Sequence, residues 1–204
     1  MNGQLAADVE RANDARTRLV ESAIELFHDR SYTAVSVQQL CEHADVKKGS
    51  FYHFFPTKRE LALAAVSELQ QRVKVSIWEP LFSEDITPQE RLERVFDEAC
   101  EYFSPPQSGV MRGCPFGSLA AELSTQDEAM REAIEGVFDM FTGYFRRAIQ
   151  EALDTGDVSG IDSEHTAEEM LAYFQGAFLV AKVKNDPDFV RRAAPGVTRF
   201  LQKQ

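Results

Sequence analysis

Long apolar runs are absent from this chain of 204 residues, which has no stretch approaching the roughly 18 apolar residues of a membrane-spanning helix. The first fourteen residues also lack the apolar segment of a secretion signal, because Asp8, Glu10 and Arg11 interrupt them. We therefore expect a cytoplasmic protein that has no membrane partner.

Cysteine is scarce, and the few cysteines do not form a recognisable site. Cys41, Cys100 and Cys114 are odd in number and lack the C-x-x-C spacing of a zinc site. Glycine-rich phosphate loops, nucleophile elbows and clusters of metal ligands are missing too. The sequence thus predicts no disulfide framework and no metal, and we expect no cofactor.

The chain also lacks the net positive charge that helps a protein to bind nucleic acid, since its formal net charge is −11. The negative charge is unevenly distributed, however. Residues 1–60 hold 8 Lys/Arg against 9 Asp/Glu, and the remaining residues hold 14 against 24. Within the first part, Lys47–Arg59 has four cations and no carboxylate. A local basic patch of this kind is compatible with binding of double-stranded DNA in one orientation.

Strand patterns are almost absent, and nearly every apolar run follows the i, i+3, i+4 spacing of a helix, so we expect an all-α fold. Residues 1–14 are predicted to form a flexible arm, residues 15–56 a three-helix helix-turn-helix domain, and residues 57–204 a larger helical domain. Helices are predicted at 15–30, 36–44, 48–54, 57–78, 88–103, 114–123, 127–153, 163–184 and 187–202.

Two short predicted helices in the N-terminal part carry the first functional pattern. Ser36 and Gln39 have the spacing of a capping box, and Pro56 stops the second helix. Two short helices joined by a tight turn form the helix-turn-helix plan, in which the second helix enters the major groove of DNA. The predicted DNA-binding residues are Ser36, Gln38, Lys47, Lys48, Gly49, Ser50, Tyr52, His53 and Lys58.

The same segment resembles the signature of the TetR family of bacterial repressors. Residues 31–61 read SYTAVSVQQLCEHADVKKGSFYHFFPTKREL, and the match includes K-G-S-F-Y-H-F-F with Lys58 three residues later. The resemblance implies that Lys47–His53 is the recognition helix and that Tyr52 and Lys58 contact phosphates. It also implies a homodimer whose affinity for an operator is controlled by a small-molecule effector, with repression as the default.

Three positions depart from the family pattern. Ser31, Val35 and Asp45 stand where the family usually has Gly, Thr and Gly. We expect the turn residue Asp45 to have a positive φ, a conformation that Asp tolerates better than most other non-glycine residues.

The C-terminal part is rich in large aromatic residues, most of which belong to a core. Helices of this composition also enclose apolar pockets, and the resemblance implies an effector cavity here, so this part is predicted to be a ligand-binding and dimerisation domain. The predicted effector-site residues are Phe96, Phe103, Cys114, Phe116, Phe141, Phe145, Tyr173, Phe178 and Lys182.

Cys114 has a sharper local context than the other cysteines. It follows Arg112 and Gly113 at the start of a predicted helix, where the helix dipole and a nearby guanidinium lower the pKa of a thiol. The segment is similar to that of a TetR subgroup with members that sense electrophiles through this cysteine, and Lys182 lies where such proteins have a lysine. One alternative function is therefore a repressor that senses electrophiles through Cys114; the other interpretation is an inert pocket cysteine.

The last two predicted helices carry apolar stripes. A pair of such helices, doubled by a two-fold axis, forms a four-helix bundle between subunits, whereas packing within one subunit fits the periodicity equally well. The resemblance favours dimerisation. The predicted dimer residues are Met170, Phe174, Ala177, Ala181, Val190 and Val197.

Taken together, the sequence predicts a ligand-responsive transcriptional repressor that binds a pseudo-palindromic operator as a homodimer and is released by a small molecule. An enzyme with Cys114 as nucleophile and His165 as base is one rival, and a helical carrier or scaffold is another. We expect that the chain is not an enzyme, because His165 beside Glu164 and Glu168 fits an exposed helix start better.

Overall fold

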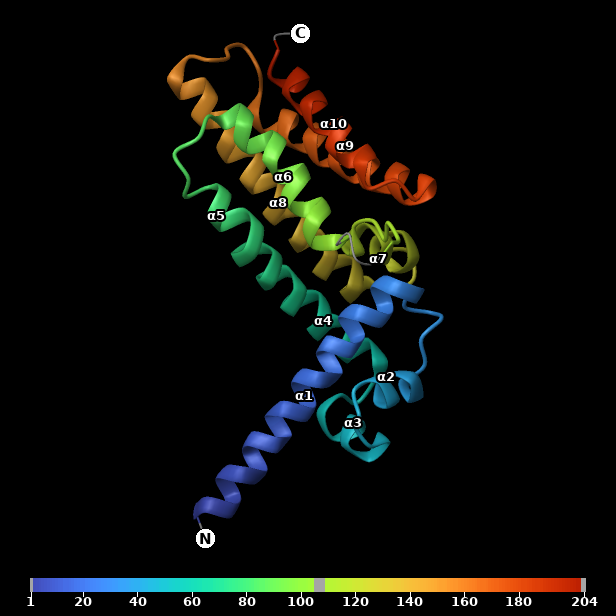
Figure 1. The fold of residues 1–204 in the computed structure, drawn as a ribbon. Helices are drawn as coiled ribbons and strands as arrows, with labels where there is room; N and C mark the ends of the chain where they lie inside the picture. The colour runs from blue at the N-terminus through green and yellow to red at the C-terminus, as the bar shows by residue number, and fades with distance from the viewer. Residues whose placement is uncertain (1, 105–108, 203–204) are drawn as a thin grey trace. The chain divides into compact units, whose positions relative to one another are not determined.

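The computed structural model describes residues 2–104 and 109–202, and the regular structure within those ranges is helical, as predicted (Figure 1). Many bounds match the sequence prediction, including both ends of α6 and α9. The elements are α1 Asn2–Arg30, α2 Val37–His43, α3 Lys48–Phe54, α4 Lys58–Val73, the π-helical turn η1 Lys74–Trp78, α5 Glu79–Leu81, α6 Pro88–Phe103, α7 Pro115–Leu123, α8 Glu128–Thr155, α9 Ser163–Lys184, α10 Asp188–Ala193 and the 3₁₀ helix η3 Ala194–Leu201. None of the described helices is long and apolar enough to cross a membrane.

The chain divides into two compact units. Unit 1 contains Met1–Gln71 together with Leu119–Ala133, and unit 2 contains Arg72–Ser118 together with Ile134–Gln204. The predicted boundary after residue 56 differs from this division, because most of α4 and the junction of α7 with α8 pack with the N-terminal helices. The helices α4, α7 and α8 each run from one unit into the other.

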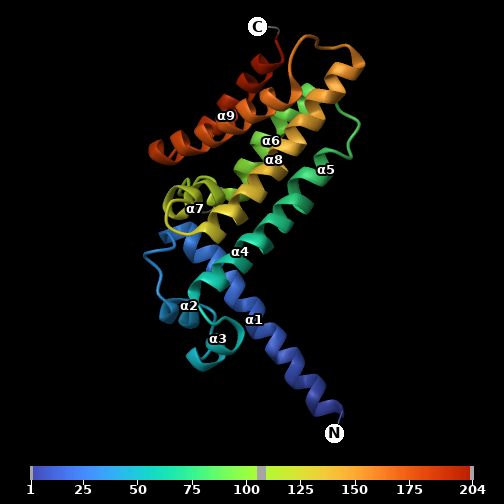
Figure 2. The same cartoon turned by 180° about the vertical axis from the view of Figure 1, so that it is seen from behind.

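In unit 1, α2 and α3 lie against the C-terminal half of α1 (Figure 2). Leu19 and Ala23 of α1, Leu40 of α2 and Phe51 of α3 are each fully buried, so one small apolar core holds the three helices. The helix α1 begins at Asn2, where the sequence analysis placed a loose arm before residue 15. Residues 4–14 contain no Gly or Pro and several alanines, which permits the helix to extend.

In unit 2, α6 packs against α10 and η3, and α9 packs against the same two elements. The segment around Pro195 and Gly196 ends the α-helix at Ala193 and continues as the 3₁₀ helix η3, which fits the interruption expected from the proline. Tyr173 of α9 donates a hydrogen bond to the Ala193 carbonyl at 2.8 Å, at the point where the helix type changes.

Candidate nucleic-acid interface

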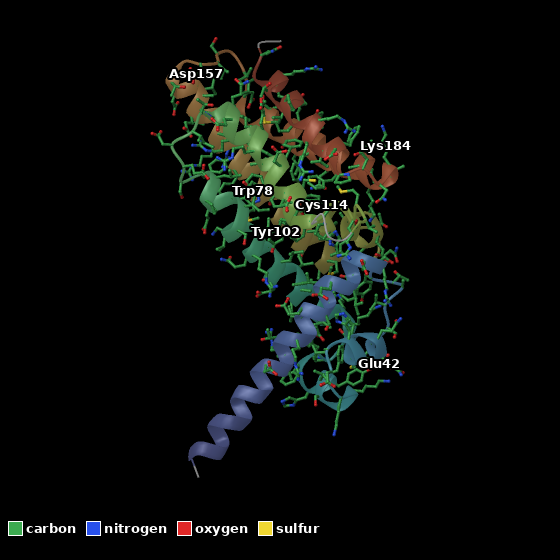
Figure 3. All side chains as sticks on the ribbon, viewed as in Figure 1. Glu42, Trp78, Tyr102, Cys114, Asp157 and Lys184 are labelled. Carbon is green, nitrogen blue, oxygen red and sulfur yellow. The ribbon has the colours of Figure 1, made fainter. Side chains whose placement is uncertain are left out.

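The N-terminus of α2 has the capping box that the sequence predicted. The Ser36 side chain accepts a hydrogen bond from the Gln39 backbone N–H at 3.2 Å, and the Gln39 side chain accepts one from the Ser36 N–H at 2.9 Å. The first turn of α2 is therefore held without help from other parts of the chain. Gln38 is exposed, but its amide donates to the Glu42 carboxylate at 2.9 Å (Glu42 is labelled in Figure 3).

The helix α3 presents its polar residues on one exposed surface. Lys47, Lys48, Gly49 and His53 are exposed, and Ser50 is half-buried. A Cβ added at Gly49 would meet nothing within 4 Å, so another backbone can approach closely at this point.

The aromatic residues of α3 divide between this surface and the core. Tyr52 is 49% exposed, and its ring packs edge-on against the fully buried Phe51 at a centroid distance of 5.1 Å. Phe55 is buried and Phe54 is half-buried. The contact with the buried Phe51 therefore anchors an otherwise exposed Tyr52 ring to the core.

Two turn residues of unit 1 have the left-handed backbone conformation. Asp45, between α2 and α3, has φ +50°, as predicted, and Ser31, which follows α1, has φ +79°. Both stand where the family pattern has glycine, so glycine is the residue that each turn favours. The positive φ of Asp45 was predicted from the sequence, whereas that of Ser31 was not.

Replacing Ser31 by glycine is expected to raise the free energy of unfolding by up to about 1 kcal/mol. The substitution relieves a left-handed conformation that costs a serine roughly 1–2 kcal/mol. Part of this gain is lost because glycine has a greater chain entropy in the unfolded state. Urea denaturation of both proteins measures the difference. Ser67→Gly in the exposed middle of α4 is the control, and there we expect a loss of about 0.5 kcal/mol. A loss at position 31 as large as that at position 67 would contradict the argument.

The ammonium group of Lys58, a predicted phosphate contact, is hydrogen-bonded to the protein backbone in this structure. Its ammonium group donates to the carbonyl oxygens of Tyr32 at 3.0 Å and Val35 at 2.9 Å, and it lies 4.0 Å from the centroid of the Tyr32 ring. Burial lowers the pKa of this lysine. The first turn of α4 faces the loop between α1 and α2, so Lys58 holds that loop.

Two carboxylates that no sequence pattern indicated complete the same unit. Glu122 of α7 accepts hydrogen bonds from the backbone N–H groups of Tyr32 at 3.0 Å and Thr33 at 2.7 Å. Burial pushes the pKa of the Glu122 carboxyl upward, but these hydrogen bonds and the charge of Lys58 outweigh it and hold the pKa below its ordinary value. The contact joins residues about 90 positions apart, and no local pattern signals it.

The second carboxylate, Asp127, precedes α8. Its Oδ2 lies 2.6 Å from Nε of Arg59, and its Oδ1 accepts from the Met130 N–H at 3.1 Å, in the manner of a helix cap. The side-chain hydrogen bond from Arg59 is the largest of the effects that lower the pKa of Asp127. The first turn of α4 is thereby tied to the start of α8.

Most of the predicted effector-site residues form the aromatic core of unit 2. Phe116 of α7 packs against Phe103 and Phe141, at centroid distances of 6.4 and 5.9 Å, and Phe103 packs against Phe178 at 5.8 Å. Phe96 and Phe145 are fully buried, and both pack against Phe174. Tyr173 is half-buried and Lys182 is exposed. These rings fill one another's space, so a ligand among them requires some of them to move.

Trp78, which no sequence pattern indicated as a site residue, extends this aromatic core. It is buried, stacks on Tyr144 at 5.0 Å and contacts Phe141 and Phe145. It ends the π-helical turn η1, a backbone irregularity that is frequent at functional sites.

Cys114 is buried at the start of α7, and its pKa is raised rather than lowered (Figure 3). Burial is the largest effect on the thiol. Backbone hydrogen bonds from Gly117 and Phe116 and the side chain of Gln175, whose Nε2 lies 3.6 Å from Sγ, oppose it only in part. The expected low pKa was therefore wrong, because the helix dipole acts on a thiol that has lost its solvent.

Lys182 does lie beside the Cys114 segment. Its ammonium donates to the Ser118 hydroxyl at 3.1 Å, and its Cδ lies 3.1 Å from where a Cβ of Gly113 would be. Gly113 has φ +78°, so both its backbone conformation and this close approach favour glycine.

All six predicted dimer residues are buried within this subunit, so their prediction as interface residues was wrong. Met170, Phe174, Ala181, Val190 and Val197 are fully inaccessible, and Ala177 is 5% exposed. The opposite face of α9 is the one that is open, with Leu179 63%, Val180 38% and Val183 80% exposed. Ala172 and Gly176 are exposed on the same helix. Because α9 is apolar on both faces, periodicity alone selected the buried one.

His165, the proposed partner of Cys114 in an enzyme, is exposed. Its ring nitrogens lie 3.9 Å from Glu168 and 3.5 Å from Glu169, whereas the thiol of Cys114 has Gln175 as its side-chain partner. The nucleophile and base that an enzyme would need are thus not brought together.

A small helix-turn-helix unit with an exposed cationic α3, joined to a larger helical unit with an aromatic core, defines a DNA-binding regulator. Comparison with known families agrees: residues 19–65 match the family model described as bacterial regulatory proteins, tetR family, and residues 88–197 match the tetracyclin repressor-like C-terminal domain. The chain belongs to the TetR family, whose members are transcriptional regulators and not enzymes.

The chain is similar to several named members over most of its length. It is 28% identical to the HTH-type transcriptional repressor NemR of Escherichia coli, covering 93% of this chain and 94% of that protein. It is 27% identical to the HTH-type transcriptional repressor DhaR of a Mycobacterium species, covering 84% of each chain. Among solved structures, the regulatory protein TetR from Rhodobacter sphaeroides superposes with a TM-score of 0.83 at 26% identity, covering 92% of this chain and 99% of that one.

Proposed function

We propose that this protein is a ligand-responsive transcriptional repressor that binds a pseudo-palindromic operator as a homodimer and leaves it when a small molecule binds to unit 2. The observation that carries the proposal is the exposed surface of α3, where Lys47, Lys48, Tyr52 and His53 stand on a rigid apolar base with no carboxylate among them. Such a protein acts in the cytoplasm, where its operator is.

The polar residues of α3, together with Lys47 before it and Gln38 of α2, contribute to binding in two ways. Lys47, Lys48 and Tyr52 bind phosphate oxygens and set the position of the helix in the groove, whereas Ser50, His53 and Gln38 lie where base edges are read. The open backbone at Gly49 lets the helix approach the duplex closely. In a dimer, two copies of α3 spaced about 34–36 Å apart meet successive major grooves on one side of the DNA.

The exposed apolar face of α9 supports a homodimer. Leu179, Val180 and Val183 form a stripe of large apolar residues, and the small residues Ala172 and Gly176 on the same helix permit close approach of a second helix. A two-fold axis beside α9 pairs this face with itself. We therefore propose these five residues of α9 as the dimer interface in place of the six predicted from the sequence.

The effector is proposed to be a small, mostly apolar molecule that enters the aromatic core of unit 2. This proposal is favoured over electrophile sensing through Cys114, because the thiol is buried and its burial raises the pKa, which disfavours the reactive thiolate. Phe116 belongs to α7, so a ligand that displaces the rings around Phe116 also shifts this helix.

Replacing Lys48 by alanine is expected to weaken binding to a selected operator by about 10-fold and to reduce the slope of log affinity against log salt by about one. The duplex is first selected from random-sequence DNA by the wild-type protein, and binding is then measured by fluorescence anisotropy at several salt concentrations. Arg199→Ala, which removes an exposed cation from η3, is the control and should leave both values unchanged. Equal effects of the substitutions at positions 48 and 199 would mean that α3 is not part of the DNA-binding surface.

A further inference from the structure

The helix α7 belongs to both units of the chain. Its first residues, from Pro115 to Ser118, lie in unit 2, and Leu119–Leu123 lie in unit 1. A continuous helix advances about 1.5 Å per residue and bends little over two turns. A shift or rotation of its first turn is therefore carried to its last turn, about 7 Å away.

The first turn of α7 is tightly packed against α9 within unit 2. The Gln175 amide lies 3.6 Å from the Cys114 sulfur, and the Lys182 ammonium donates to the Ser118 hydroxyl at 3.1 Å. A Cβ at Gly117 would lie only 2.5 Å from Oε1 of Gln175. The end of the Gln175 side chain fills this space, so a molecule that enters beside this turn displaces that side chain first and a bulkier one displaces α7 as well.

The last turn of α7 holds the loop that leads into α2. The two carboxylate oxygens of Glu122 each accept one backbone N–H of that loop, from Tyr32 and from Thr33. Lys58 binds carbonyl oxygens of the same loop, those of Tyr32 and Val35. The donors and acceptors of a short loop are thus fixed by one anion from α7 and one cation from α4.

We propose that Glu122 is the positioning residue through which α7 sets the orientation of α2 and α3, so that movement of the first turn of α7 draws its carboxylate away from the Tyr32 and Thr33 amides and lowers operator affinity. This inference rests on the proposed function. In a purely structural role, Glu122 would stabilise unit 1, but a displacement of α7 at Gly117 would not change operator affinity through it.

A double-mutant cycle tests the link without a known effector. Gly117→Leu places a wedge between α7 and Gln175, and Glu122→Gln keeps the shape of the side chain but removes its charge and one acceptor. In the wild-type background, Gly117→Leu is expected to weaken binding to the selected duplex by 5- to 150-fold, the usual range of coupling between sites. In the Glu122→Gln background, the same wedge is expected to change affinity less than 2-fold.

Two controls keep the test specific. Gly136→Leu adds the same side chain to a helix of unit 2 at a position where a Cβ would meet nothing within 4 Å, and it should leave affinity unchanged. Hydrogen exchange of the Tyr32 and Thr33 amides should quicken in the Gly117→Leu protein and remain slow in the control. If Gly117→Leu does not fold, Gly117→Ala is the smaller wedge for the same cycle.

The outcomes separate the two proposals. Additive effects of the Gly117 and Glu122 substitutions, or unaltered exchange of the two amides, would overturn the link while leaving the repressor function intact. Failure of the wild-type protein to select any duplex would instead overturn the proposed function, and this inference with it.

Discussion

Replacing Arg91 by methionine is expected to lower the free energy of unfolding by about 3–5 kcal/mol, because three backbone carbonyl oxygens lose a charged hydrogen-bond donor at about 1–3 kcal/mol each. The Arg91 side chain is almost fully buried and donates to the carbonyl oxygens of Leu81 at 3.0 Å, Glu84 at 3.2 Å and Ile86 at 3.2 Å. It also pairs with the Glu151 carboxylate at 2.6 Å. Methionine fills a similar volume but leaves all four acceptors without this donor. Urea denaturation followed by circular dichroism measures the loss.

The neighbouring Arg94 provides the control. It pairs with Glu84 and Glu98 at the surface, where an ion pair contributes at most about 1 kcal/mol. Arg94→Met should therefore change the free energy of unfolding by less than about 1 kcal/mol. Similar losses at positions 91 and 94 would mean that the loop between α5 and α6 does not depend on the buried guanidinium.

Substituting glutamate for both Leu179 and Val183 is expected to convert the proposed dimer to monomers and to weaken operator binding by about 10²- to 10⁴-fold. Each substitution occurs twice across a two-fold interface, so the pair places four carboxylates against apolar surface. Loss of the second recognition helix then removes the gain in affinity that comes from linking two binding modules. Sedimentation velocity reports the oligomeric state, and anisotropy with the selected duplex reports the affinity.

Val75→Glu is the matched control, because Val75 is 50% exposed in unit 2 but lies on η1 rather than α9. That variant should remain dimeric and bind the duplex normally. A Leu179→Glu, Val183→Glu protein that sediments as a dimer would place the interface on another surface and leave the exposed face of α9 unexplained.

Local signals allowed much of the fold to be predicted from the sequence. The start of α6 follows from Pro88 in its first turn, and the end of α9 follows from Asn185, which adopts the left-handed conformation of a helix cap. The capping box at Ser36 and the positive φ of Asp45 were predicted for the same reason: each depends on residues within four positions.

The sequence does not reveal which side chains contact residues that are far away along the chain. Lys58 matched the family pattern, yet its ammonium faces backbone carbonyls more than twenty positions away, and Glu122 finds its amides about ninety positions away. For Cys114, the dipole of α7 is a local property that sequence reveals, whereas the burial that outweighs it is a property of the packed unit. The predicted dimer residues of α9 were wrong because both faces of this helix are apolar, and the periodicity does not show which face is buried within the subunit.

The division of the chain has a practical meaning for anyone who exchanges recognition specificities between regulators of this kind. A graft that stops at Gln71 would carry the reading helix but leave behind Leu119–Ala133, and with it the carboxylates that hold Arg59 and the loop before α2. We therefore expect a functional chimera to need both segments, because unit 1 is built from two stretches of sequence that are not contiguous.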